Sequence, residues 1–175
     1  SAELINKIND DLVRNQLAVL SCEETLIPVR ITVNKTQKLV PAHAQELVKI
    51  GKEHGEVVVL DADLMVDTGV YPFHKDFPER HIECGIAEQD MVSMAGGLAL
   101  KGLLPIVHSF ACFLSTRANE QIYTNATEQK KIIYVGALAG LLPAGPGHSH
   151  QSVRDISALG SVPGLVMIQP GTEDQ

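Results

Sequence analysis

Short apolar runs alternate along this chain with segments in which apolar residues recur every three to five positions. The runs lie at residues 57–60, 104–107, 132–135 and 165–168, with a shorter one near 81–84, and helical patterns begin near 41, 85, 114 and 151. Continuous apolar runs are typical of strands covered on both faces, and intervening helices make right-handed crossovers. The alternation therefore predicts an α/β fold, a doubly wound and mostly parallel sheet with helices on both faces.

The first 38 residues do not share this alternation. Apolar residues in 2–18 are spaced as in a short amphipathic helix, and 19–38 show no sustained period. We predict two parts, an N-terminal helix and linker over residues 1–38 and one domain over residues 39–175.

Charge and composition exclude several classes of protein. The 14 basic and 21 acidic residues give a net charge of −7, whereas proteins that bind a nucleic-acid backbone concentrate positive charge. No apolar stretch is long enough to span a bilayer, and no signal peptide is evident. The three cysteines, Cys22, Cys84 and Cys112, form no C-x-x-C pair. We expect a cytoplasmic protein that binds neither membranes nor nucleic acids.

Ligands of doubly wound sheets bind beyond the carboxyl ends of the strands, so residues after each run are candidates for a site. Glu88 follows the run at 81–84 at the start of a helix. One interpretation is a carboxylate that stabilises the helix N-terminus. The other is a carboxylate buried at the sheet edge, where it can share a proton with a nitrogen heterocycle.

The next strand end carries Phe110 and Phe113, two of only seven aromatic residues. They either pack in the core or stack on a flat heterocycle. Arg117, one turn further on, either is solvated or meets an anionic substrate.

A glycine-rich loop, residues 136–147, leads to His148 and His150. It lacks the phosphate-binding glycine motifs, and this histidine pair has no evident further metal ligand. A catalytic or substrate-orienting histidine suits the residue's pKa near neutrality. Asp63, after the first strand, either solvates the strand end or contacts a ligand.

The sequence of residues 79–92, ERHIECGIAEQDMV, followed by AGGLA at 95–99, resembles the pyrimidine-binding domain of transketolases. Relatives of that domain include 1-deoxyxylulose-5-phosphate synthase and the β subunits of 2-oxoacid dehydrogenases. The resemblance runs from about residue 39 to the end of the chain and implies thiamin diphosphate as the cofactor. By this resemblance Glu88 hydrogen-bonds to the pyrimidine, Phe113 stacks on it and Phe110 lines its pocket. His150 would face the substrate, and Asp63 would lie near the cofactor.

Three positions depart from that family. Leu138 stands where sugar-phosphate transketolases have a histidine, Pro146 where an aspartate reads donor hydroxyls, and Thr116 where a third aromatic is expected. The family holds Mg²⁺ and diphosphate with a G-D-G…N motif on another domain, and the 175 residues lack that motif. The resemblance thus implies a diphosphate-binding partner and a homo-oligomer, with residues 88–102 as the candidate interface.

The resemblance leads to three hypotheses. The first is the pyrimidine-binding part of a transketolase-like enzyme that moves a two-carbon ketol unit between sugars or sugar phosphates. The second is a 1-deoxyxylulose-5-phosphate synthase or a 2-oxoacid dehydrogenase β-type subunit. The third is a non-catalytic dimerisation module that keeps only the fold.

Overall fold

The computed structural model describes residues 6, 10, 13, 14, 38–141 and 146–174. Contacts divide the chain into two units, Ser1–Thr36 and Gln37–Gln175. The four described residues of the first unit are helical. The rest of the predicted helix at 2–18 and nearly all of the predicted linker lie outside the described residues, so the division of the chain at residue 38 remains a prediction.

The second unit is built on a parallel sheet, which confirms the predicted α/β fold. Its strands are β1 (Val57–Asp61), β2 (His81–Glu83), β3 (Leu104–Phe110) and β4 (Ile133–Ala137), arranged in the order β2-β1-β3-β4. All three strand pairs are parallel. The strands therefore end at one common edge.

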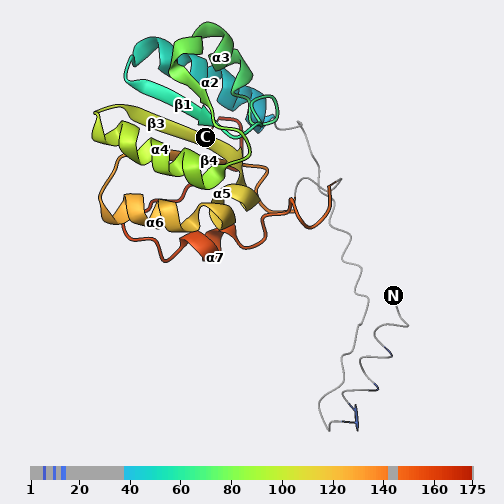
Figure 1. The fold of residues 1–175 in the computed structure, drawn as a ribbon. Helices are drawn as coiled ribbons and strands as arrows, with labels where there is room; N and C mark the ends of the chain where they lie inside the picture. The colour runs from blue at the N-terminus through green and yellow to red at the C-terminus, as the bar shows by residue number, and fades with distance from the viewer. Residues whose placement is uncertain (1–5, 7–9, 11–12, 15–37, 142–145, 175) are drawn as a thin grey trace. The chain divides into compact units, whose positions relative to one another are not determined.

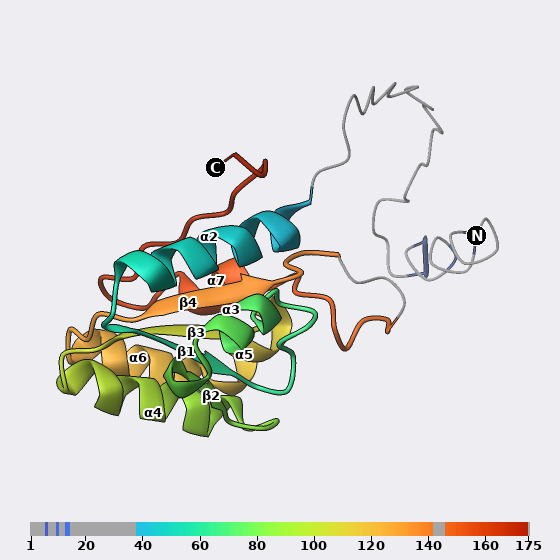
Figure 2. The same ribbon diagram turned by 90° about the horizontal axis from the view of Figure 1, so that it is seen from above.

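Helices cover both faces of this sheet, as Figures 1 and 2 show. The helices α2 (Leu39–Glu53) and α3 (Tyr71–Asp76) lie on one face, with a 3₁₀ turn η1 at Pro78–Arg80. The helices α4 (Glu88–Leu100), α5 (Ala111–Arg117) and α6 (Asn119–Thr127) pack on the other, and α7 (Asp155–Leu159) contacts α5. No helix in the described segments is both long and apolar enough to cross a membrane.

Alternate residues of each strand point into two cores. Val57 and Val59 of β1 face Leu47 of α2 and Phe73 of α3. The intervening residues face the other core, which is formed by Val58, Leu60, Met91, Val92, Ala95, Val107, Leu114, Ala118 and Ile122. This alternation within a continuous apolar strand is the pattern expected of a sheet buried on both sides.

Gly96 allows α4 and α6 to approach closely. A Cβ at this position would clash with Oδ1 of Asn125. Asn125, which is itself buried, donates from Nδ2 to the Val92 carbonyl oxygen at 2.9 Å. The glycine therefore makes room for a polar tie between the two helices, which fixes α4 and the residues at its N-terminus.

Three predicted elements were wrong in extent or kind. The run at 165–168 is not a strand within the described sheet; it follows a turn at Gly164 (φ +71), and Val166 and Ile168 are exposed. A strand needs a neighbouring backbone in register, which an apolar run alone does not specify. The predicted helix at 114–126 is two helices, because Asn119 donates its side-chain amide to the Ser115 and Ala158 carbonyl oxygens at the break. The last helix is only Asp155–Leu159 rather than 151–159.

Candidate functional site

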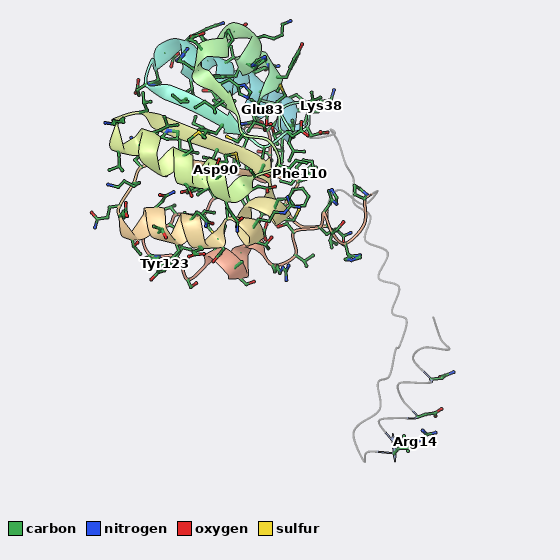
Figure 3. The ribbon with its side chains drawn as sticks, in the orientation of Figure 1. Arg14, Lys38, Glu83, Asp90, Phe110 and Tyr123 are labelled. Carbon is green, nitrogen blue, oxygen red and sulfur yellow. The ribbon has the colours of Figure 1, made fainter. Side chains whose placement is uncertain are left out.

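The candidate site lies at the carboxyl edge of the sheet. Figure 3 shows Glu83 at the end of β2 and Phe110 at the end of β3, with Asp90 in the first turn of α4 nearby. Parallel strands bring these ends together, as expected for a doubly wound sheet. The site is therefore assembled from strand ends and the helices that follow them.

A tight turn after β2 places Glu88 at the start of α4. The Cys84 backbone N–H donates to the Asp61 carbonyl oxygen at 2.9 Å, which ties this turn to β1. Gly85 adopts a positive φ of +69°, which favours glycine. Glu88 is then the first residue of α4 and is only 3% exposed. Its burial agrees with the second sequence interpretation, whereas its role toward a cofactor remains a prediction.

Arg117 is the ionic partner of Glu88. Its Nη1 donates to Oε1 of Glu88 at 2.6 Å, and its side chain is 41% exposed whereas that of Glu88 is 4% exposed. The guanidinium carbon lies 3.9 Å from the centroid of the Phe113 ring, within cation–π range. Arg117 is thus neither a solvated helix residue nor an open anion site, and the sequence interpretation missed this pairing.

Phe110, Phe113 and His150 form an aromatic cluster beside this ion pair. The two phenylalanine rings are 5.7 Å apart with an interplanar angle of 29°. The His150 ring meets Phe113 edge-on at 5.0 Å and Phe110 at 6.2 Å. The Ser149 hydroxyl lies 2.9 Å from Nδ1 of His150 and helps to orient it. The structure therefore brings four of the five predicted site residues to one place.

Asp63 is the fifth predicted residue, and the described contacts fix its backbone rather than its carboxylate. It is exposed and has a positive φ of +60°. Its backbone N–H donates to Oε1 of Glu83 at 2.8 Å, and the Gly85 N–H donates to the same oxygen at 2.8 Å. Glu83 therefore joins the end of β1 to the turn before Glu88. The sequence interpretation missed this function of Glu83, although a carboxylate two residues before a turn glycine could have suggested it.

Asp61 caps the turn after β1 from a buried position. Its Oδ2 accepts the Leu64 N–H at 2.7 Å, and its Oδ1 accepts the Thr68 hydroxyl at 3.3 Å. Burial raises the pKa of the Asp61 carboxyl to about 6, and the nearby Glu83 carboxylate adds to that rise. Its contacts are those of a turn-capping residue.

The loop after β4 gives no metal site among the residues that the structure describes. His148 is exposed, and no group of three or more possible metal ligands occurs in the described parts of the chain. Leu138, one of the family departures, adopts a positive φ of +55°, and Pro146 is exposed. Residues 142–145 lie outside the described part.

Comparison with known proteins identifies the family. Residues 36–175 match the model described as "Transketolase, pyrimidine binding domain". A putative transketolase C-terminal section from Methanocaldococcus jannaschii is 39% identical over 129 residues, which cover 73% of this chain and 41% of that protein. A 1-deoxy-D-xylulose-5-phosphate synthase from Magnetococcus marinus is 34% identical over 132 residues, which cover 75% of this chain and 21% of that protein.

Two solved structures are similar to this chain. One is titled "Split gene transketolase, inactive beta4 tetramer"; it has a TM-score of 0.59 and 35% identity, and the match covers 70% of this chain and 39% of that one. The transketolase of Campylobacter jejuni has a TM-score of 0.74 at 20% identity, over 80% of this chain and 22% of that one. The matched segment thus covers less than half of each of these proteins. It belongs to the transketolase pyrimidine-binding domain family, whose enzymes use thiamin diphosphate.

Proposed function

We propose that this chain is the pyrimidine-binding part of a transketolase-like enzyme that transfers a two-carbon ketol unit with thiamin diphosphate. The observation that carries the proposal is the buried Glu88 carboxylate at the carboxyl edge of the sheet, where Arg117 joins it to the ring of Phe113. The family match supports the proposal, because enzymes of this family use thiamin diphosphate.

The described residues fit an aminopyrimidine ring chemically. Glu88 offers a hydrogen-bonding carboxylate that is shielded from water. The flat guanidinium of Arg117 donates an N–H to this carboxylate in the free chain. Phe113 offers a ring face to that same donor. A flat heterocycle with ring nitrogens would meet the same two partners.

The cofactor supplies a nucleophilic thiazolium carbon, which is able to take up a two-carbon unit from a ketose. The chain's own residues act around it. Glu88 shares a proton with N1′ of the pyrimidine and so favours the tautomer in which the cofactor's amino group can act as a base. Phe110 and Phe113 hold the ring and exclude water. His150, edge-on to both, holds or moves a proton on the substrate. Asp63 lies near the cofactor, at the strand end that Glu83 fixes.

The proposed enzyme requires a diphosphate-binding domain or subunit, which would hold Mg²⁺ with the diphosphate. Two of the similar proteins are named as a transketolase C-terminal section and a split-gene transketolase. On the proposed interface helix α4, Leu100 is 63% exposed, and Ile86 just before the helix is 72% exposed. We propose that copies of this domain associate there and that the assembly works in the cytoplasm.

A 1-deoxyxylulose-5-phosphate synthase is the second candidate. The similarity to the Magnetococcus marinus synthase favours it. A non-catalytic dimerisation module has no need for a buried glutamate together with an aromatic cluster, so we place it last.

Reconstitution tests this proposal. The chain is mixed with a candidate diphosphate-binding subunit, and the mixture and each part alone are titrated with thiamin diphosphate and Mg²⁺ by calorimetry. Tight binding only in the mixture, with ketol transfer from a ketose, supports the proposal. Turnover of pyruvate but not of ketoses would instead identify the synthase. Binding that is as weak in the mixture as in the parts, without turnover, would contradict both.

A further inference from the structure

Arg117 contacts both side chains that an aminopyrimidine would need, the carboxylate of Glu88 and the ring of Phe113. Its Nη1 lies 2.6 Å from Oε1 of Glu88, and its guanidinium carbon lies 3.9 Å from the Phe113 centroid. A guanidinium is flat, presents N–H donors in its plane and stacks on aromatic faces. These are also the properties by which a protonated aminopyrimidine binds a carboxylate and a phenyl ring.

Phe113 also has two aromatic neighbours, which limit the room around its ring. Phe110 stacks beside it at 5.7 Å, and His150 meets it edge-on at 5.0 Å. Arg117 bonds Oε1 of Glu88, and the competition is for the ring face of Phe113, which does not stack on two flat partners at once. Arg117 and the pyrimidine therefore compete for the same place.

Arg117 is free to leave this position. It is the last residue of α5, and its side chain is 41% exposed. In the described part of the chain, its recorded side-chain contacts are the hydrogen bond to Glu88 and the ring of Phe113. Its release into solvent breaks no other recorded contact of the fold.

Glu88 has the opposite requirement. It is 3% exposed, and a buried carboxylate without a partner is strongly destabilising. Before the cofactor binds, Arg117 provides the partner that the carboxylate needs. When the pyrimidine arrives, its nitrogen can replace the guanidinium without leaving the carboxylate unpaired.

Building on the proposed function, we propose that Arg117 is a displaceable placeholder for the aminopyrimidine of the cofactor. In the free chain it pairs with Glu88 and covers Phe113; on binding, the aminopyrimidine takes both contacts and the guanidinium swings outward. Arg117 therefore keeps the empty site folded and lowers the affinity for the ring.

The test uses the full chain and 4-amino-2,5-dimethylpyrimidine as the probe, without diphosphate or metal. Calorimetry compares the wild type with Arg117→Gln and Arg117→Lys. Lys131→Gln, which removes an exposed cation just before β4, at the opposite edge of the sheet, is the matched control. We expect Arg117→Gln to bind the probe roughly tenfold more tightly, because the competitor is gone. Arg117→Lys should lie between it and the wild type, since an ammonium group neither lies flat nor donates in one plane. Lys131→Gln should match the wild type.

A second measurement follows the guanidinium itself. Side-chain ¹⁵N spectra, with the Arg117 signal assigned by its loss in Arg117→Gln, should show restricted guanidinium rotation in the free chain and free rotation at saturating probe. This readout does not depend on how well the glutamine variant folds. Two results would overturn the placeholder proposal. One is a guanidinium whose rotation stays restricted at saturating probe, and the other is an Arg117→Gln variant that binds the probe no more tightly than the wild type does.

The two proposals fail differently. If the probe binds the wild type, and Glu88→Gln weakens that binding while Arg117→Gln does not strengthen it, the placeholder is wrong and the proposed function stands. If the probe does not bind the wild type or either Arg117 variant, the placeholder proposal fails, whereas the reconstitution with a diphosphate-binding subunit still decides the proposed function.

Discussion

The two faces of the sheet bury polar groups in different ways. On the α2 and α3 side, Nε2 of His43 lies 2.9 Å from Nε2 of His108, and His108 is fully buried. His74 and His81 form a second pair, with 3.1 Å between their Nδ1 atoms. On the α4 and α5 side, a buried carboxylate is paired with an arginine that reaches solvent.

The chemistry of the two partners explains this difference. Burial, together with the neighbouring His43, lowers the pKa of His108 to about 3, so the histidine pair is neutral and suited to a permanent interior. The Glu88–Arg117 pair has one buried and one exposed member, so one partner can be exchanged without unfolding the core. The proposed site therefore differs from the histidine pairs in having one partner that is partly exposed to solvent.

Glu88→Gln should have the largest effect, a loss of turnover, and it tests the proposed site on the α4 and α5 side of the sheet. Glutamine keeps the shape but cannot share a proton with the pyrimidine, so kcat of the assembled enzyme should fall by about 10²- to 10⁴-fold. Steady-state assays at saturating cofactor measure this fall, and circular dichroism checks the fold. His108→Leu is the matched control on the other face and should change kcat by less than about twofold if the assembly is intact. Near-normal turnover by Glu88→Gln would exclude the assigned role.

Lower pH should destabilise the α2 and α3 side first. Burial lowers the pKa values of His43, His81 and His108, so the unfolded chain binds more protons than the folded chain below about pH 6.5. The free energy of unfolding should therefore decrease as the pH falls from 6.5 toward 3. Of the three, His108, whose pKa falls from 6.5 to about 3, should contribute most to this decrease.

Asp61 opposes that trend. Its folded pKa of about 6 exceeds the ordinary aspartate value of 3.8, so it contributes stability that is complete below about pH 4 and is lost as the pH rises through 6. Urea titrations between pH 7.5 and 4 measure the sum. The decrease should be steeper in Asp61→Asn, which lacks the opposing group, and shallower in His108→Leu. A wild-type stability that rises between pH 6.5 and 4 would show that Asp61 outweighs the histidines.

His108→Leu should have a moderate effect on stability. It leaves Nε2 of half-buried His43 without its partner, and an unsatisfied polar group of this kind costs about 1–3 kcal/mol. The double variant His43→Leu/His108→Leu removes both polar groups and should recover most of that loss. Urea unfolding of the four proteins gives the coupling energy. A double-variant loss equal to the sum of the two single-variant losses would mean that the two histidines do not support each other.

The sequence indicated the site better than it indicated the contacts within it. Glu88, Phe110 and Phe113 follow strand ends, so periodicity and sheet topology alone placed them near one another. The Glu88–Arg117 pair joins residues 29 apart, through the packing of α4 against α5, which no local pattern encodes.

The same reason accounts for the errors in the fold. The strands at 57–60 and 104–107 were predictable because both faces are buried and each has neighbours in the sheet. The run at 165–168 has the same apolar character but no partner strand in the described structure. An apolar run indicates which residues avoid water. Whether that run becomes a strand depends on a neighbouring backbone, which the rest of the fold must bring alongside it.

Substitutions of Glu83 should have the smallest effect on affinity for the aminopyrimidine. Glu83 belongs to none of the buried pairs, so these substitutions test whether the backbone around the proposed site matters as well as its side chains. Its Oε1 holds the backbone N–H groups of Asp63 and Gly85 at 2.8 Å each. Glu83→Ala frees the turn before Glu88, and because Glu83 is exposed we expect a loss of only about 1 kcal/mol, or about fivefold in affinity for the aminopyrimidine. Glu83→Gln retains an acceptor oxygen and should lose less. Calorimetry with the same pyrimidine measures both, and Glu120→Ala on the exposed surface of α6 is the control. A Glu83→Gln loss as large as that of Glu83→Ala would show that the charge of this residue, rather than its hold on the two backbone groups, is what the site requires.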